Sequence, residues 1–246
     1  MRLDHGVLTH FPAPAGRNNL RSSCPGGGCR PLLHSEAHRS RIAFARDGVE
    51  AFVLEYDCGG AAWREAAAHA VRVCRLGERT RGTAGIAADH VQSADFRQAP
   101  IWQDCWRRRG GTDWFRGHGF AGAPMSAVLC YPVVSARMHR GSFVRLAGEN
   151  AAEQRRFSLE TLVSALMPRT FLWHTLTDAT VPVENTLLLE AALRRENISH
   201  ELHLFPHGVH GLALADLETA DPMKGRVPDR HINRWQALCA EWLKEE

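Results

Sequence analysis

Two loops in the second half of the sequence carry the residue types of an acid–base pair. Asp178 follows the apolar run at 170–174, and His210 follows the alternating run His200–Phe205. A carboxylate beside an imidazole holds the ring in one tautomer and stabilises its charged form, so the imidazole can act as general base and then as general acid. We predict these roles for Asp178 and His210. A turn residue and a surface histidine at a strand end are the plainer alternatives.

A glycine triplet near the N-terminus supplies a second element of such a site. Cys24 and Pro25 lead into three consecutive glycines at 26–28. Because glycine has no Cβ, its backbone N–H group can approach a substrate oxygen closely. Backbone N–H groups placed in this way stabilise the oxyanion that forms during acyl transfer. The triplet therefore predicts an oxyanion hole, with a flexible turn as the alternative.

A metal site is the other chemistry that these residue types suggest, and the spacing argues against it. Four histidines lie at positions 200, 203, 207 and 210. Alternation along a strand places His200 and His203 on opposite faces, so their rings do not converge. Cys24 and Cys29 have no second pair of cysteines at the spacing of a zinc site. We therefore predict no metal.

The segments that must position these loops alternate between strand and helix. Apolar or alternating runs predict strands at Val49–Tyr56, 127–134, 170–174 and His200–Phe205. Helical periods predict helices at 35–47, 61–76, 158–163, 183–196 and 229–246. The residues up to about Ser23 show no clear period and are predicted to be loop. This order favours a mostly parallel sheet with helices on both faces, and sites in such sheets form at the carboxyl ends of the strands.

Six segments of the sequence together match the pattern of one protein family. They are AFVLEYD at 51–57, LCYPV at 129–133, GEN at 148–150, SLE at 158–160, FLWHTLTDATVPVENT at 171–186 and FPHGVHGLALA at 205–215. Together they resemble the α/β-hydrolases of the acetyl-esterase and acetylxylan-esterase type, which are related to the dienelactone hydrolases. The resemblance is dense over 127–246 and less complete over 24–57. It implies one domain over 1–246 with the three-layer α/β-hydrolase fold.

The resemblance also implies an activity. Members of this family are serine-type esterases without a cofactor, so it predicts a carboxylic ester hydrolase for small acyl esters, with acetylated sugars among the candidate substrates. Asp178 and His210 fall on the acid and base positions of the family, and Gly27 and Gly28 fall on its oxyanion-hole loop. Cys29 stands where the family has an aromatic residue, so this wall of the pocket differs.

The segment that should carry the nucleophile departs from the family pattern. Residues 85–91, GIAADHV, resemble the lead-in to the family's elbow, but the chain continues as QSADFRQAP over 92–100. The sequence contains no G-x-S-x-G, and Ser93 lacks the flanking glycines that an exposed, strained elbow needs. No nucleophile is identified. The stretch at 77–119 shows no sustained period, which is unusual inside a compact domain.

A shift of reading frame accounts for this stretch. Codons for residues 92–110 can be chosen so that a shifted frame reads VCGFSAGAHLAGLLAAEG, which contains the elbow and the start of its helix. The serine codon would straddle Phe96 and Arg97. We therefore expect impaired activity and the loss of a central strand and the helix behind it. A non-catalytic or ligand-binding protein of the same fold is the alternative function.

Composition limits the remaining function classes. The 246 residues suit one α/β domain, and a net charge of +3 does not argue for nucleic acid or membrane. Trp102, Trp106 and the arginines at 107–109 could form an aromatic and basic patch, but the shifted frame explains them as accidents. The first residues lack the order of a signal peptide, and the seven cysteines show no disulfide rhythm, so we expect a cytoplasmic protein with reduced thiols. No oligomeric state is predicted.

Overall fold

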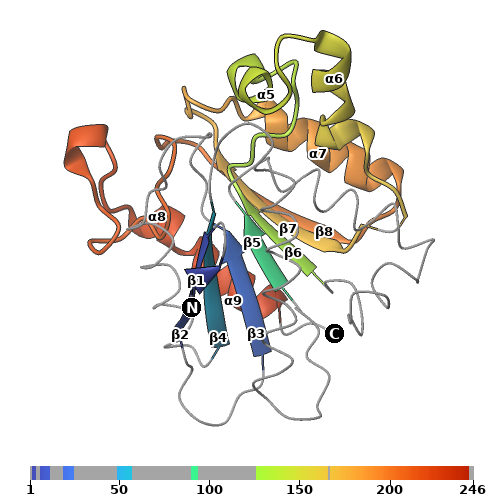
Figure 1. Cartoon of the computed structure of the whole chain (residues 1–246). Helices are drawn as coiled ribbons and strands as arrows, with labels where there is room; N and C mark the ends of the chain where they lie inside the picture. Colours follow the sequence, from blue (N-terminus) through green and yellow to red (C-terminus); the bar gives the residue numbers. More distant parts are fainter. Residues whose placement is uncertain are drawn as a thin grey trace, which may run out of the picture.

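The computed structural model describes residues 126–165 and 167–243, and the backbone of five strands nearer the N-terminus (Figure 1). These strands are β1 (Arg2–Leu3), β2 (Gly6–Phe11), β3 (Asn19–Cys24), β4 (Val49–Tyr56) and β5 (His90–Ser93). Side chains are described from Ala127 to Leu243, except those of Leu146 and Leu166. The helices predicted at 35–47 and 61–76 lie outside the described residues.

The described strands form one eight-stranded sheet with the order β1-β2-β4-β3-β5-β6-β7-β8. Its last three strands are β6 (Ser126–Cys130), β7 (Arg169–Thr175) and β8 (His200–Phe205). The pairs β1–β2 and β2–β4 are antiparallel, and every pair from β4 onward in this order is parallel. The order reverses between β3 and β5, and open α/β sheets bind ligands beyond the carboxyl ends of the strands at such a reversal.

Helices cover both faces of the described part of the sheet. Successive residues of a strand point to opposite faces, so each strand contributes side chains to both layers of packing. One face packs against α9 (Trp235–Trp242) in a cluster that includes Val128, Phe171, Trp173 and Trp235. The other face packs against α7 (Glu184–Arg195) in a cluster that includes Leu129, Leu172, Leu189 and Leu193. Every residue of β7 after Arg169 is buried, as expected for a strand covered on both faces. The three layers confirm the predicted fold class.

Two predictions about the first half of the chain are wrong. The stretch up to Ser23, predicted to be loop, contains β1, β2 and most of β3. Strand β2 pairs with β4, and β3 pairs with both β4 and β5, so tertiary context rather than a local pattern makes these segments strands. The central strand expected to be lost is present as β5, between β3 and β6.

The helices of the second half also differ in detail from the prediction. The single helix expected at 229–246 is two helices, α8 (Arg230–Asn233) and α9. At the break, the Asn233 side chain donates to the Leu214 carbonyl at 2.7 Å, and the Trp235 indole donates to the Ala213 carbonyl at 3.0 Å. These tertiary hydrogen bonds have no signature in the local pattern.

Three short helical segments lie between β6 and β7. Helices α5 (Arg140–Ala147) and α6 (Ala151–Arg156) were not predicted, although Asn150 caps α6 by accepting from the N–H groups of its second and third residues. The helix expected at 158–163 is a single 3₁₀ turn, η2 (Leu159–Thr161). The sequence patterns of these segments are too short to show a helical period.

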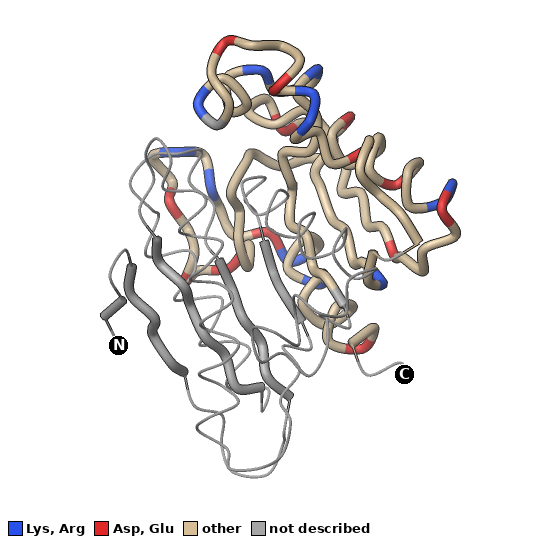
Figure 2. Tube along the Cα trace, turned by 45° about the vertical axis from the view of Figure 1, so that its right-hand side comes forward, with Lys and Arg blue, Asp and Glu red and all other residues tan. Residues whose placement is uncertain are grey.

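Charged residues are intermixed along α5, α6 and α7 (Figure 2). Several form exposed ion pairs, such as Arg140 with Glu149 at 2.8 Å and Arg156 with Glu153 at 2.9 Å. Exposed pairs of this kind contribute little to stability, so the buried clusters are what hold these layers together. Within the described residues, no helix combines the length and apolar character needed to cross a bilayer.

Candidate active site

Asp178 lies in the loop that follows β7, and the loop holds its carboxylate by backbone contacts. The Asp178 N–H donates to the Thr175 carbonyl at 3.3 Å, which turns the chain just past the strand. Oδ1 then accepts from the N–H groups of Thr180 and Val181, each at 2.9 Å. Aspartate favours such turns because its short side chain reaches backbone donors two residues ahead. These local contacts hold Oδ1 and leave Oδ2 to other partners.

His210 lies in the loop that follows β8, and this loop is fastened to the one that carries Asp178. Thr175 and Thr177 donate their hydroxyls to the Gly208 carbonyl at 3.0 and 3.1 Å, and the Gly208 N–H donates back to Thr177 Oγ1 at 2.9 Å. Because β7 and β8 are parallel neighbours, both loops leave the same edge of the sheet. The pairing of the strands thus places the two loops side by side.

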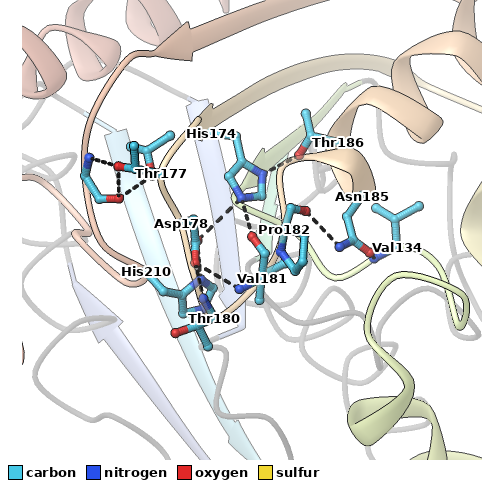
Figure 3. Close-up of polar contacts among 12 residues, drawn as sticks. Val134, His174, Thr177, Asp178, Thr180, Val181, Pro182, Asn185, Thr186 and His210 are labelled. Carbon is cyan, nitrogen blue, oxygen red and sulfur yellow. Dashed lines mark hydrogen bonds and ion pairs between the residues drawn. The ribbon is translucent and has the colours of Figure 1, made fainter.

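The two side chains meet (Figure 3). His210 Nδ1 lies 2.7 Å from Asp178 Oδ2, and the carboxylate is fully buried while the imidazole is a quarter exposed. A carboxylate accepts hydrogen bonds, so Nδ1 carries the proton and Nε2 is left as an acceptor. This is the tautomer that a general base needs.

The Asp178 carboxyl is ionised at neutral pH. Burial alone would raise its pKa, but hydrogen bonds from His174 and His210, the charge of a protonated His210 and the N–H of Val181 outweigh burial and hold the pKa well below its usual value. An ionised, buried Asp178 stabilises positive charge on the imidazole that it contacts.

Two further residues hold His210 in place. The Tyr131 ring packs edge-on against the imidazole with centroids 4.9 Å apart, and its hydroxyl accepts from the Ala213 N–H at 3.2 Å. Tyr131 has a left-handed backbone at φ 39, a conformation that costs free energy for a bulky residue. Arg226 donates from Nε to the His210 carbonyl at 3.1 Å. Asp178 and Tyr131 thus contact the imidazole, and Arg226 holds the backbone that carries it.

Three residues at this site were not predicted from the sequence: Tyr131, Arg226 and His174, a fully buried imidazole beside Asp178. Tyr131 and His174 belong to the LCYPV and FLWHT segments, so the family pattern contained a signal for them. Arg226 belongs to no segment of that pattern, and only its packing against the loop of His210 identifies it.

Of the other residues considered for the site, the structure describes the backbone of Ser93 but not the oxyanion-hole glycines. Gly27, Gly28 and Cys29 lie outside the described residues, shortly after the end of β3 at Cys24. Ser93 is the last residue of β5, and its backbone pairs with Leu129 in β6 and Cys24 in β3. The ends of β3 and β5 therefore flank the point at which the sheet order reverses.

The histidines of β8 lie apart from this pair. His200 Nε2 is 3.6 Å from Glu190 Oε1, and His203 Nε2 is 2.6 Å from Glu201 Oε1. Over 126–165 and 167–243, no three His, Cys, Asp or Glu side chains are gathered as a metal ion would require. These two histidines make ordinary polar contacts with nearby carboxylates.

Comparison with solved structures supports the fold. The acetyl ester-xyloside bifunctional hydrolase of Caldicellulosiruptor lactoaceticus is 28% identical, with a TM-score of 0.77 over 97% of this chain and 87% of its own. A sugar hydrolase of Lactococcus lactis is 21% identical, with a TM-score of 0.80 over 99% of this chain and 95% of its own. A carboxylesterase of Lactobacillus plantarum is 19% identical, with a TM-score of 0.77 over 100% of this chain and 98% of its own.

A comparison with curated sequences finds a longer relative. Endo-1,4-beta-xylanase B of Butyrivibrio fibrisolvens is 38% identical over 248 residues, which is 87% of this chain but 36% of that protein. The chain thus spans about a third of the length of this relative. No protein-family model matches the chain.

The sheet order and the parallel strands are those of the α/β-hydrolase fold. Among proteins of this fold, the chain is similar to the hydrolases of the acetyl-esterase and acetylxylan-esterase-like type. The family resemblance that the sequence indicated is confirmed.

Proposed function

We propose that this chain is the scaffold of a carboxylic ester hydrolase for small acyl esters, with acetyl esters of sugars as the favoured substrates. The contact of His210 with Asp178 at 2.7 Å is the observation that carries the proposal, because it leaves Nε2 free to accept a proton from a nucleophile. The names of an acetyl ester-xyloside hydrolase and a xylanase among the relatives support the choice of acetylated sugars.

In an intact relative, the reaction would proceed through an acyl-enzyme. A serine hydroxyl loses its proton to His210 Nε2 and attacks the ester carbonyl, while backbone N–H groups of Gly27 and Gly28 stabilise the oxyanion. The imidazolium then gives its proton to the leaving alcohol, and water repeats the sequence on the acyl-enzyme. Asp178 stabilises the imidazolium in both steps. No cofactor is part of this mechanism.

The esterase activity of the present chain is expected to be strongly impaired, since its sequence has no G-x-S-x-G. Without the nucleophile no acyl-enzyme forms, and only the part of catalysis due to binding and the oxyanion hole is left. A cytoplasmic location remains a prediction from the sequence.

Restoring the elbow tests the proposal. In one variant, residues 92–110 are replaced by VCGFSAGAHLAGLLAAEG, and in its matched control the serine of that segment is alanine. We expect the restored chain to hydrolyse p-nitrophenyl acetate faster than the control by roughly 10³-fold or more, with acylation visible as a burst. A restored chain that melts cooperatively but hydrolyses no faster than its alanine control contradicts the proposed function.

A non-catalytic role is the second candidate, and the lack of a G-x-S-x-G segment favours it. In this case the chain keeps a pocket and binds an ester or sugar without turnover. A ligand that binds only the folded state raises the melting temperature. Stabilisation of the chain as written by an acetylated xylooligosaccharide, without release of acetate, would favour this role over the esterase.

A further inference from the structure

We propose that His174 is a positioning residue that holds the Asp178 carboxylate toward His210, a role that rests on the proposed function of that pair. His174 is the sixth residue of β7, and its ring is fully buried between that strand and the start of α7. Its Nε2 atom lies 3.4 Å from Asp178 Oδ2, the oxygen that contacts His210 Nδ1 at 2.7 Å (Figure 3). One carboxylate oxygen therefore lies between two imidazoles.

The contacts of His174 determine which ring nitrogen carries the proton. Nε2 lies 3.0 Å from the Val181 carbonyl oxygen, which only accepts hydrogen bonds, so Nε2 is a donor. Nδ1 lies 2.6 Å from Thr186 Oγ1, and a hydroxyl can donate to it. A neutral ring with its proton on Nε2 satisfies every one of these partners. The Nε2–H then donates to Val181 O at 3.0 Å, and Asp178 Oδ2 lies 3.4 Å from the same nitrogen.

This arrangement closes a ring of contacts around the carboxylate. The Val181 N–H donates to Asp178 Oδ1 at 2.9 Å, and the carbonyl of the same residue accepts from His174. Thr186 lies in the first turn of α7, so its contact with Nδ1 ties the imidazole to that helix. Rotation of the carboxylate would break the contacts of Oδ1 and separate Oδ2 from both rings. His174 thus resists a rotation that the backbone donors alone would resist less.

Burial strengthens the interaction between His174 and the Asp178 carboxylate. The side chains of His174 and Asp178 are both 0% exposed. In a water-excluded site an N–H dipole directed at a carboxylate interacts more strongly than it would in water, and no solvent molecule replaces it when it is removed. Loss of the Nε2 donor therefore leaves Oδ2 with His210 alone and frees the carboxylate to move away from it.

The test reads the tautomer of His210 in the full chain, and it needs no turnover. Long-range ¹H–¹⁵N correlation spectra of ¹⁵N-histidine-labelled protein report which ring nitrogen is protonated, and His210→Asn identifies the signals of His210. We expect Nδ1–H in the wild type. His174→Leu, which removes the donor, should shift the neutral ring toward Nε2–H and abolish the hydrogen-bonded Nδ1 proton signal.

Two further variants make the result specific. His174→Gln keeps an N–H donor near the place of Nε2 and should retain the wild-type tautomer of His210. His200→Leu makes the same substitution in β8, where the ring contacts Ile198 O and Glu190, and should also leave the tautomer unchanged. A His174→Leu protein that melts cooperatively with an unaltered His210 tautomer overturns the proposal. If His174→Leu does not melt cooperatively, His174→Gln decides: the wild-type tautomer supports the proposal and a shifted one overturns it.

Failure here and failure of the proposed function are distinguishable. A shifted tautomer in His174→Leu, together with a restored chain that does not hydrolyse esters, would keep the positioning role and reject the esterase. Serine-dependent hydrolysis by the restored chain, together with an unaltered tautomer in His174→Leu, would keep the esterase and reject the positioning role.

Discussion

The Nδ1 atom of His210 and the Oδ2 atom of Asp178 are 2.7 Å apart, although 32 positions separate the two residues in the chain. The contact exists because β7 and β8 are adjacent and parallel, so that the loops that follow them leave the sheet together. The pair that we propose as the acid and base of a hydrolase site is therefore assembled in a chain whose sequence has no G-x-S-x-G.

The chain as written should hydrolyse p-nitrophenyl acetate at a rate close to that of its His210→Ala variant. An imidazole without a serine beside it has no proton to accept from a nucleophilic side chain, so its removal should change the rate by less than about tenfold. Initial rates of the two purified proteins provide the measurement. Fast hydrolysis that His210→Ala abolishes would mean that another side chain serves as nucleophile, and fast hydrolysis that ignores the substitution would contradict the assignment of His210.

Asp178→Asn should destabilise the protein at neutral pH and much less in acid. The pKa of Asp178 in the folded chain lies below its unfolded value of about 3.9, so the ionised carboxylate stabilises the fold at pH values above about 4. This contribution is lost as the pH falls below about 4 toward the folded pKa, because the carboxyl then becomes protonated.

Denaturant midpoints of the wild type and Asp178→Asn at several pH values between about 7 and 3 measure the effect. The difference between the two proteins should be largest at the upper end of this range and should narrow toward its lower end. A difference that stays constant across the range would show that the carboxylate charge is not what stabilises this loop.

Gly208→Ala should destabilise the loop of His210 by about 1–3 kcal/mol. Gly208 has φ +147, and a Cβ built on it would lie 2.7 Å from Thr175 Cγ2 and 2.8 Å from Leu212 Cδ1. A side chain at this position therefore meets both backbone strain and packed atoms. Gly141→Ala is the matched control, because a Cβ there meets only the flexible end of Arg145 at 3.7 Å, and alanine favours the helix α5. Chemical denaturation should show the two variants changing stability in opposite directions.

Asn185→Ala should destabilise the protein, because it removes hydrogen bonds to the loop that follows β6. The buried side-chain oxygen of Asn185 accepts from the N–H groups of Val134 and Ser135, each at 3.0 Å, and its amide donates to the Pro182 carbonyl at 2.9 Å. Alanine leaves these buried groups without their partner, at about 1–3 kcal/mol for each group that no water reaches.

Asn185→Asp separates the two functions of this side chain. Aspartate can still accept from Val134 and Ser135 but cannot donate to Pro182 while ionised, so we expect its loss of stability to be smaller at low pH than at neutral pH. If Asn185→Ala unfolds at the wild-type denaturant concentration, the link between α7 and this loop is not important for stability.

Some elements could be predicted from local patterns in both halves of the chain, and the strand predicted at Val49–Tyr56 is β4 with the same bounds. The strand His200–Phe205 and the helix at 183–196 agree with β8 and α7 to within a residue, because each pattern records which faces are buried. Strands β2 and β3 were missed because their residues show no clear period of apolar and polar side chains, although they pair with β4 and β5. The break between α8 and α9 was missed because it depends on hydrogen bonds to Ala213 and Leu214.

The candidate site divides in the same way. The contact between Asp178 and His210 could be predicted from residue type, chain order and place after a strand, because these are properties of the linear sequence. The tertiary structure decided that a second imidazole, His174, lies against the same carboxylate and that Tyr131 and Arg226 hold His210. Such contacts depend on the pairing of β6, β7 and β8 and on the packing of buried side chains, and no local period of hydrophobic and polar residues encodes them.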